Sequence, residues 1–118
     1  MALEFRPIVS IPAFDIQVVQ DGRSTRIAPT GELDIATTPA LEQAIAEATG
    51  TPGTKLVLDL RSLTFMDSTG LRTLAQTNAR AEDDGFTLSI VRGPRQIDRV
   101  LEISGLGALL PLVEAPPG

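Results

Sequence analysis

Alternating apolar and polar residues near the beginning of the chain predict two strands. Residues 14–19, Phe-Asp-Ile-Gln-Val-Val, alternate for most of their length, as a half-buried strand does. Asp21-Gly22 follows, and this dipeptide favours the tight turn of a β-hairpin. Residues 24–28 would form the returning strand. The ordered part of the chain is therefore expected to open with a β-hairpin.

Helical spacing of apolar residues begins after Thr38-Pro39. The Thr38 hydroxyl is able to cap free helix amides, and proline suits the first helical position because its missing N–H would have no partner there. The helix is expected to end near residue 48, before Gly50 and Pro52. The predicted buried stripe recurs at helical spacing and consists of Leu41, Ala44, Ile45 and Ala48.

A nearly continuous apolar run over residues 55–60 predicts a central strand buried on both faces. A second helix is expected to start near Ser68 and to end before Gly85, since glycine suits the left-handed turn after a helix. Its predicted buried positions are Leu71, Leu74, Ala75 and Ala79, and its predicted solvent face carries Arg72, Thr73, Gln76 and Arg80.

The last third of the chain repeats the alternation of strand and helix. Residues 86–91 predict a strand and residues 94–104 a third helix that ends at Gly105. The order β-β-α-β-α-β-α predicts one α/β domain with a mixed β-sheet flanked by helices. We expect this domain to cover residues 14–113, after a lead-in of residues 1–13 and before a flexible tail of residues 114–118.

Composition narrows the classes of function. A net charge of −5 without a cluster of basic residues argues against nucleic acid and anionic membranes as partners. The chain has no cysteine and no histidine, so we expect no enzyme activity, no metal site and no cofactor. The first residues lack the apolar stretch of a signal peptide or a membrane span. We therefore expect a cytoplasmic protein whose partner is another protein.

Residues 63–71 follow the central strand directly, so Asp67 and Ser68 lie in a loop beyond the strand end and at the start of the second helix. Sheets of α/β proteins place functional groups in loops beyond strand ends, and a helix start offers free N–H groups. A phosphate on Ser68 would be accommodated there, and Gly70 would leave room for the backbone of another protein. Ser and Asp are also favoured helix caps, so a purely capping role is the alternative, and the spacing alone leaves both open.

Two motifs at this spacing resemble those of a known family. Residues 31–34, Gly-Glu-Leu-Asp, together with residues 64–71, Thr-Phe-Met-Asp-Ser-Thr-Gly-Leu, look like the STAS domains of bacterial anti-sigma-factor antagonists. The similarity also includes the intervening helix and central strand, and it covers about residues 14–112. Ser68 matches the family's phosphoacceptor.

The resemblance implies partner switching in transcription regulation and stress response. The unphosphorylated chain would bind a partner that is both anti-sigma factor and serine kinase, and so release a sigma factor. Phosphorylation of Ser68 would oppose docking through bulk and charge, and a metal-dependent serine phosphatase would reverse it. The chain would be a monomer or a weak dimer. By similarity the partner-binding residues would be Glu32, Asp34, Asp67, Thr69, Gly70 and Arg72.

Four residues have more local interpretations that remain open. Asp34 fits an Asx turn before the first helix as well as an ion pair with a partner. Asp59 fits a strand-end residue satisfied by nearby amides better than a catalytic base. Arg72 fits a solvated helix face or a partner interface. Pro29 interrupts the strand that leads into residues 31–34, so that strand is expected to be short or to lie at a sheet edge.

Other function classes fit the sequence less well. A receiver domain would use Asp59 as its phosphorylated aspartate, but the lysine it needs after its last strand is missing, since Lys55 is the only lysine. A serine hydrolase would need a glycine where Met66 stands, and a histidine. No phosphate-binding loop ending in Gly-Lys-Ser/Thr is present. The alternative function that keeps the fold is a STAS scaffold or accessory subunit of a stress-signalling complex or a membrane transporter.

Overall fold

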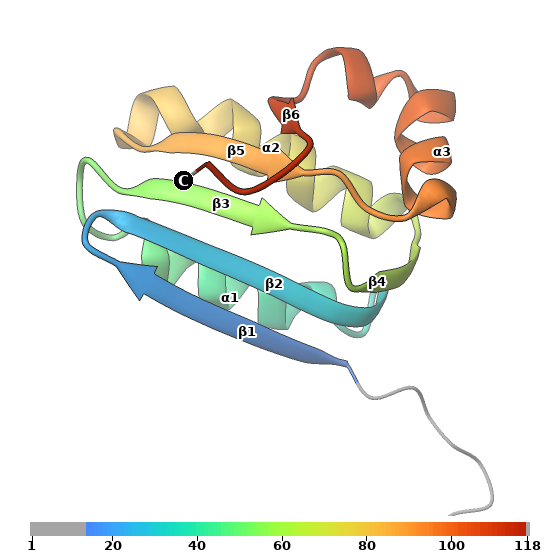
Figure 1. Cartoon of the computed structure of the whole chain (residues 1–118), viewed down its shortest axis with the longest axis horizontal. Coiled ribbons are helices and arrows are strands. Elements are labelled where there is room, and N and C mark those ends of the chain that lie inside the picture. Colours follow the sequence, from blue (N-terminus) through green and yellow to red (C-terminus); the bar gives the residue numbers. More distant parts are fainter. Residues whose placement is uncertain (1–13, 118) are drawn as a thin grey trace, which may run out of the picture.

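The computed structural model describes residues 14–117 as an α/β domain built on a mixed sheet (Figure 1). The elements are β1 Asp15–Asp21, β2 Ser24–Leu33, α1 Thr38–Ala48, β3 Lys55–Asp59, β4 Leu63–Met66, α2 Ser68–Asp84, β5 Thr87–Val91, α3 Arg95–Ser104, the 3-10 helix η1 Leu106–Ala108 and β6 Leu112–Val113.

The strand order in the sheet is β1-β2-β3-β5-β6, and β4 pairs with β2 off this path. β1 is antiparallel to β2, and the other pairs are parallel. The predicted fold class is confirmed.

The predicted hairpin at the beginning of the domain is present. β1 and β2 pair as far as Asp21 and Ser24, across a tight turn in which Gly22 has a φ of +61°. This left-handed backbone suits glycine, which has no Cβ to clash. β2 then continues beyond residue 28, where the sequence placed its end, to Leu33.

The expectation that Pro29 shortens its strand or places it at an edge is wrong. β2 is a ten-residue strand that lies between β1 and β3. Its pairing with β3 ends at Ile27, and its pairing with β4 begins at Gly31. Pro29 therefore lies in the gap between two parallel partners, where its missing N–H interrupts neither ladder.

The core lies between the sheet and the helices α1 and α2, which cover one face of the sheet (Figure 1). α3 packs at the end of the sheet where β4 lies. The core is mainly aliphatic, with Phe86 as its buried aromatic residue in the described chain, and the side chains at its centre are at most 1% exposed. They include Ile27, Leu41, Ile45, Leu58, Leu74, Ile90, Ile97 and Leu101. No helix in residues 14–117 is both long and apolar enough to cross a membrane.

The buried face of α2 differs from the predicted one. Thr73 and Thr77 are 4% and 3% exposed, whereas Ala79 is exposed. The Thr73 hydroxyl donates to the carbonyl of Thr69 at 3.1 Å, and the Thr77 hydroxyl donates to that of Thr73 at 2.7 Å. Because each buried hydroxyl has a partner one turn back, threonine is tolerated against the core.

The helix ends confirm two predictions and correct one. Gly85 after α2 and Gly105 after α3 adopt the left-handed conformation, with φ of +75° and +79°. The predicted cap at Thr38 is wrong, because Thr38 is buried inside the first turn and Thr37 is the capping position. The backbone N–H groups of both threonines donate instead to the carbonyl of Asp34.

Two short strands were not predicted. β4 has four residues, of which Leu63 and Met66 are buried, so it lacks the alternation that marks a strand. β6 has only two residues, Leu112 and Val113. Both are strands only because a parallel neighbour lies beside them, and such pairing is not visible in a local pattern.

Candidate functional site

The two motifs of the sequence meet at one edge of the sheet. β2 runs parallel to β4 and pairs Leu33 with Met66. The N–H of Asp67 then donates to the carbonyl of Leu33 at 3.2 Å. The turn after β2, residues 34–37, therefore lies beside the first residues of α2.

Asp67 is the N-cap of α2. Its carboxylate accepts the backbone N–H of Thr69 at 2.9 Å and that of Gly70 at 3.3 Å. The Thr69 hydroxyl donates to the same oxygen. This last hydrogen bond is the main reason why the pKa of Asp67 lies below its usual value; desolvation opposes the shift, and the backbone N–H groups add to it. Asp67 is therefore ionised at neutral pH and bound within its own chain.

Ser68 is the first residue of α2 and is exposed. Its hydroxyl makes no hydrogen bond to any residue in the described range 14–117. Of the two capping candidates that the spacing left open, Asp67 performs the capping. The hydroxyl of Ser68 is free to react or to contact a partner.

Asp34 forms the Asx turn that the sequence offered as one interpretation. Its carboxylate accepts the N–H of Ala36 at 2.9 Å and that of Thr37 at 3.2 Å. The Thr37 hydroxyl donates to the carbonyl of Glu32 at 2.7 Å and accepts the N–H of Asp34. Thr37, which the sequence analysis did not single out, thus ties both ends of this turn together.

Gly70 has an internal packing role instead of the expected one. The residue is buried, and a Cβ on it would stand 2.5 Å from Cγ of Met66 and 3.0 Å from Cδ2 of Leu33. The missing side chain therefore lets α2 approach the ends of β2 and β4. The space that sequence reasoning assigned to a partner is filled by the domain itself.

Asp59 is a satisfied strand-end residue, as expected, but its partners are mainly arginines. Arg61 donates to its carboxylate at 2.7 and 2.9 Å from the guanidinium and at 3.1 Å from the backbone, and Arg26 donates at 3.3 Å. Burial favours a higher pKa of Asp59, but the hydrogen bonds and the charge of Arg61 outweigh burial, so the pKa is lowered. These bonds fix the turn that leads from β3 into β4.

Two apolar side chains beside the site are solvent-exposed. Ile35, in the turn after β2, is 76% exposed, and Phe65, near the end of β4, is 46% exposed. Glu32 pairs with Phe65 in the sheet and is half-buried. Sequence reasoning missed the apolar pair, although an isoleucine inside a polar turn is the signal that could have indicated it. Exposed apolar residues that lie close together are typical of a protein contact surface.

Arg72 lies one helical turn after Ser68 and is exposed. Its side chain forms no ion pair with any acidic residue between positions 14 and 117. Of the six residues predicted to bind a partner, Arg72 is thus exposed and Gly70 is buried. The remaining four are half-buried: Glu32, Asp34, Asp67 and Thr69.

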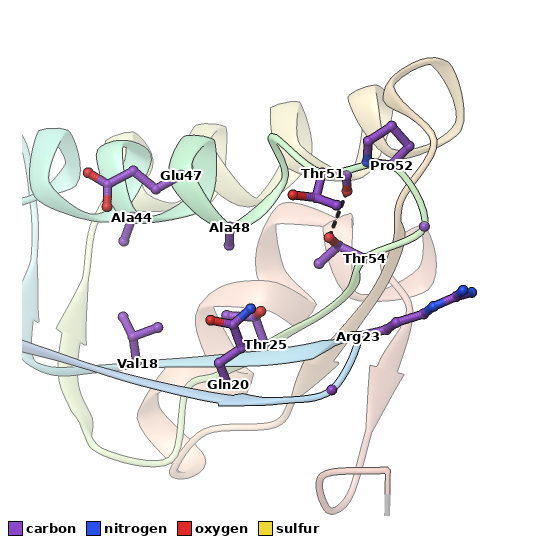
Figure 2. A pocket seen from close by; sticks show the side chains of 12 residues that line it. Val18, Gln20, Arg23, Thr25, Ala44, Glu47, Ala48, Thr51, Pro52 and Thr54 are labelled. Atoms are coloured by element: carbon purple, nitrogen blue, oxygen red, sulfur yellow. Dashed lines mark hydrogen bonds between the residues drawn. The ribbon is translucent and has the colours of Figure 1, made fainter.

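A pocket of about 500 Å³ lies at the other end of the sheet, between the β1–β2 hairpin and the end of α1 (Figure 2). The strands line it with Val18, Gln20 and Thr25, and α1 lines the opposite side with Ala44 and Ala48. β2 runs along the sheet from this pocket to the loops beside Ser68, so the two places are separate. Within the described chain, no group of three or more acidic side chains is arranged to hold a metal ion.

Curated relatives of this chain are named as regulators of anti-sigma factors. The anti-sigma-F factor antagonist RsfB of Mycobacterium tuberculosis is 44% identical over 50 residues, which are 42% of this chain and 41% of RsfB. The anti-sigma-B factor antagonist of Staphylococcus aureus is 27% identical over 96 residues, which are 81% of this chain and 89% of that protein. This chain thus matches less than half of the length of RsfB.

Solved structures share the fold. An anti-sigma factor antagonist from Mycobacterium paratuberculosis superposes with a TM-score of 0.74 at 29% identity, over 91% of this chain and 92% of that one. The antagonist SpoIIAA in its unphosphorylated form gives a TM-score of 0.72 at 21% identity, over 86% and 89% of the two chains. The phosphorylated form of SpoIIAA from Bacillus gives 0.65 at 22% identity, over 88% and 92%.

A family model described as "Mlab, STAS domain" matches residues 16–114. This range includes every helix and nearly every strand residue of the fold. It also includes both motifs that meet around Ser68. The chain belongs to the STAS domain family.

Proposed function

We propose that this chain is an anti-sigma-factor antagonist switched by phosphorylation of Ser68. The unphosphorylated form binds an anti-sigma factor that is also a serine kinase, and this binding releases a sigma factor in the cytoplasm. A serine phosphatase restores the binding form. The chain itself is the substrate and not an enzyme. The observation that carries the proposal is the exposed hydroxyl of Ser68, which has no hydrogen-bond partner among residues 14–117 because Asp67 caps the helix.

The relatives support this function. RsfB and the Staphylococcus aureus protein are named as antagonists of anti-sigma factors. SpoIIAA, which has the same fold, exists in phosphorylated and unphosphorylated forms. A scaffold or transporter-accessory role, the alternative that keeps the fold, would not require modification of Ser68.

The surface around Ser68 gives the switch a physical basis. Ile35 and Phe65 supply apolar contact area, and Glu32, Asp34 and Arg72 supply charges at its border. A neutral hydroxyl is readily buried in such an interface. A phosphate adds about 1.5 to 2 negative charges and must be desolvated on docking. A penalty of about 3 kcal/mol weakens binding more than a hundredfold.

A phosphorylation assay tests the modification. The full chain is incubated with ATP, magnesium and each candidate anti-sigma kinase, and the phosphate is located by mass spectrometry. We expect one phosphate on the wild type and on Ser62→Ala, an exposed serine in the turn before β4, and none on Ser68→Ala. Modification of another residue, or of none by any kinase that binds the chain, contradicts the proposal.

A binding assay tests the gating. Ser68→Ala keeps the neutral surface and should bind the anti-sigma factor as tightly as the unmodified wild type. Ser68→Asp adds a charge and should bind at least tenfold more weakly. Equal affinities of the two variants would mean that charge at this position does not control docking.

A further inference from the structure

The helix start of α2 has few free amides to offer a phosphate on Ser68. The N–H groups of Thr69 and Gly70 already donate to the carboxylate of Asp67, and that of Leu71 donates to the carbonyl of Asp67 at 3.1 Å. The helix start was expected to accommodate a phosphate. In the first turn of α2, however, the N–H of Ser68 is the one amide left to donate to it within the described residues. A phosphate on this residue needs another source of positive charge.

Three acidic residues lie near Ser68 in the fold. Asp67 is ionised and adjacent in sequence, and Glu32 and Asp34 stand at the end of β2, beside the start of α2. A phosphate brings about 1.5 to 2 further negative charges. Without a cation, this group of like charges destabilises the modified form.

Arg72 is placed to supply the cation. It follows Ser68 at i+4, the spacing at which two side chains lie on the same helix face. Side chains on a helix lean toward its N-terminus, so the guanidinium of Arg72 can reach toward Ser68. Both residues are exposed, and the long arginine side chain has room to move.

Three other arginines, by contrast, already form ion pairs. Arg61 and Arg26 bind Asp59, at 2.7 and 3.3 Å. Arg80, the second arginine of α2, binds Asp84 at 3.1 Å. Arg72 has no such partner within the described residues.

We propose that Arg72 is the intramolecular counter-ion of phosphorylated Ser68. This inference rests on the proposed function, and it names the residue that stabilises the modified state. The planar guanidinium donates two N–H groups to two phosphate oxygens, a geometry that lysine does not reproduce. In the unmodified chain, Arg72 faces the partner. Phosphorylation thus adds negative charge to the docking surface and also withdraws a positive charge from it.

The ion pair is tested by titrating the phosphate itself. Phosphoserine is incorporated at position 68 of the full chain during translation, so no kinase is needed, and its second pKa is measured by phosphorus NMR at low ionic strength. A nearby cation favours the dianion and lowers this pKa. We expect Arg72→Gln to raise it by roughly 0.2 to 0.7 unit, the range for an exposed ion pair.

Two further variants make the result specific. Arg80→Gln removes an equal charge about 18 Å along α2 from Ser68 and should leave the phosphate pKa unchanged. Arg72→Lys should keep part of the effect because the charge remains. The proposal is overturned if Arg72→Gln shifts the pKa no more than Arg80→Gln does. If no kinase modifies Ser68, the proposed function is refuted. The pKa measurement on the incorporated phosphoserine does not depend on a kinase and still tests the ion pair.

Discussion

The carboxylate of Asp67 lies 2.9 Å from the backbone nitrogen of Thr69 and holds the first turn of α2 in place. Ser68 stands between these two residues, and its hydroxyl takes no part in the contact. Capping and the proposed modification therefore belong to different side chains. Substitutions at the two positions should have different consequences, the first for stability and the second for binding.

Removing the cap should destabilise the domain. Asp67→Ala leaves the N–H groups of Thr69 and Gly70 without their partner, and we expect the free energy of unfolding to fall by about 1 kcal/mol. Asp67→Asn keeps an oxygen that accepts these hydrogen bonds and should lower the free energy of unfolding by less. Urea unfolding monitored by circular dichroism measures both. Ser68→Ala, at the neighbouring position, should change stability by less than about 0.5 kcal/mol, and a loss equal to that of Asp67→Ala would contradict the assignment of the cap.

Gly70→Ala should destabilise the domain although alanine is the better helix former. The gain in helix propensity is about 1 kcal/mol. The new Cβ would meet Met66 and Leu33, which are 2% and 0% exposed and have no space to yield. Overpacking of this kind costs about 1 to 3 kcal/mol, so we expect a net loss of roughly 1 kcal/mol in thermal or urea unfolding.

Gly50 provides the matched control. A Cβ there would stand 3.7 Å from the carbonyl oxygens of Ala46 and Glu47, an ordinary contact distance. Gly50→Ala should therefore be neutral or slightly stabilising, because it restricts the unfolded chain. If both glycine variants gained stability, the close approach of α2 to β4 would not be the reason for a glycine at position 70.

Features determined by a few neighbouring residues were predictable from the sequence. The turn at Gly22 and the helix ends at Gly85 and Gly105 follow from the left-handed backbone that glycine accepts. The Asx turn at Asp34 follows from a short polar side chain before a helix. In each case the physical cause lies within four residues of the position it explains.

Features determined by distant partners were not predictable in the same way. Pro29 is harmless because β2 changes its parallel partner there, and Thr73 is buried because its hydroxyl finds a carbonyl on its own helix. Asp59 was expected to be satisfied by nearby amides, and its arginine partners were missed because the sequence does not show how closely a guanidinium approaches. At the site, Ser68 was found from its motif, whereas Ile35 was missed because its exposure depends on the path of the chain.

Acid should remove the stabilisation that Asp59 provides. The pKa of Asp59 is lowered in the folded state. Its contribution to the free energy of unfolding is therefore fully present above the pKa of an unfolded aspartate, about 3.9, and is lost as the pH falls through the pKa of the folded state. At pH 7, Asp59→Asn should lower the free energy of unfolding by on the order of 1 to 2 kcal/mol, because hydrogen bonds from two arginines to a charged acceptor are weakened. Urea unfolding of both proteins at several pH values measures this.

In that titration, the informative quantity is the difference in the free energy of unfolding between wild type and Asp59→Asn. Other carboxylates, Asp67 among them, titrate equally in both proteins and cancel. The difference should shrink as the pH falls below about 4, where the unfolded aspartate takes up its proton. A difference that stays constant down to pH 3 would mean that the charge of Asp59 does not stabilise the fold.

Ile35 should contribute to partner binding without contributing to stability. Its side chain is 76% exposed beside the Asp34 turn, so Ile35→Ser removes little buried area from the folded chain. An apolar anchor at the centre of an interface contributes more than about 1 kcal/mol, so we expect the affinity for the anti-sigma factor to fall at least fivefold. Ile103 on α3 is equally exposed, at 76%, and lies outside the proposed docking surface. Calorimetric titration of the anti-sigma factor with Ile35→Ser and with the control Ile103→Ser measures the two affinities. An equal loss of affinity in both variants, or no loss in Ile35→Ser, would place the docking surface elsewhere on the domain.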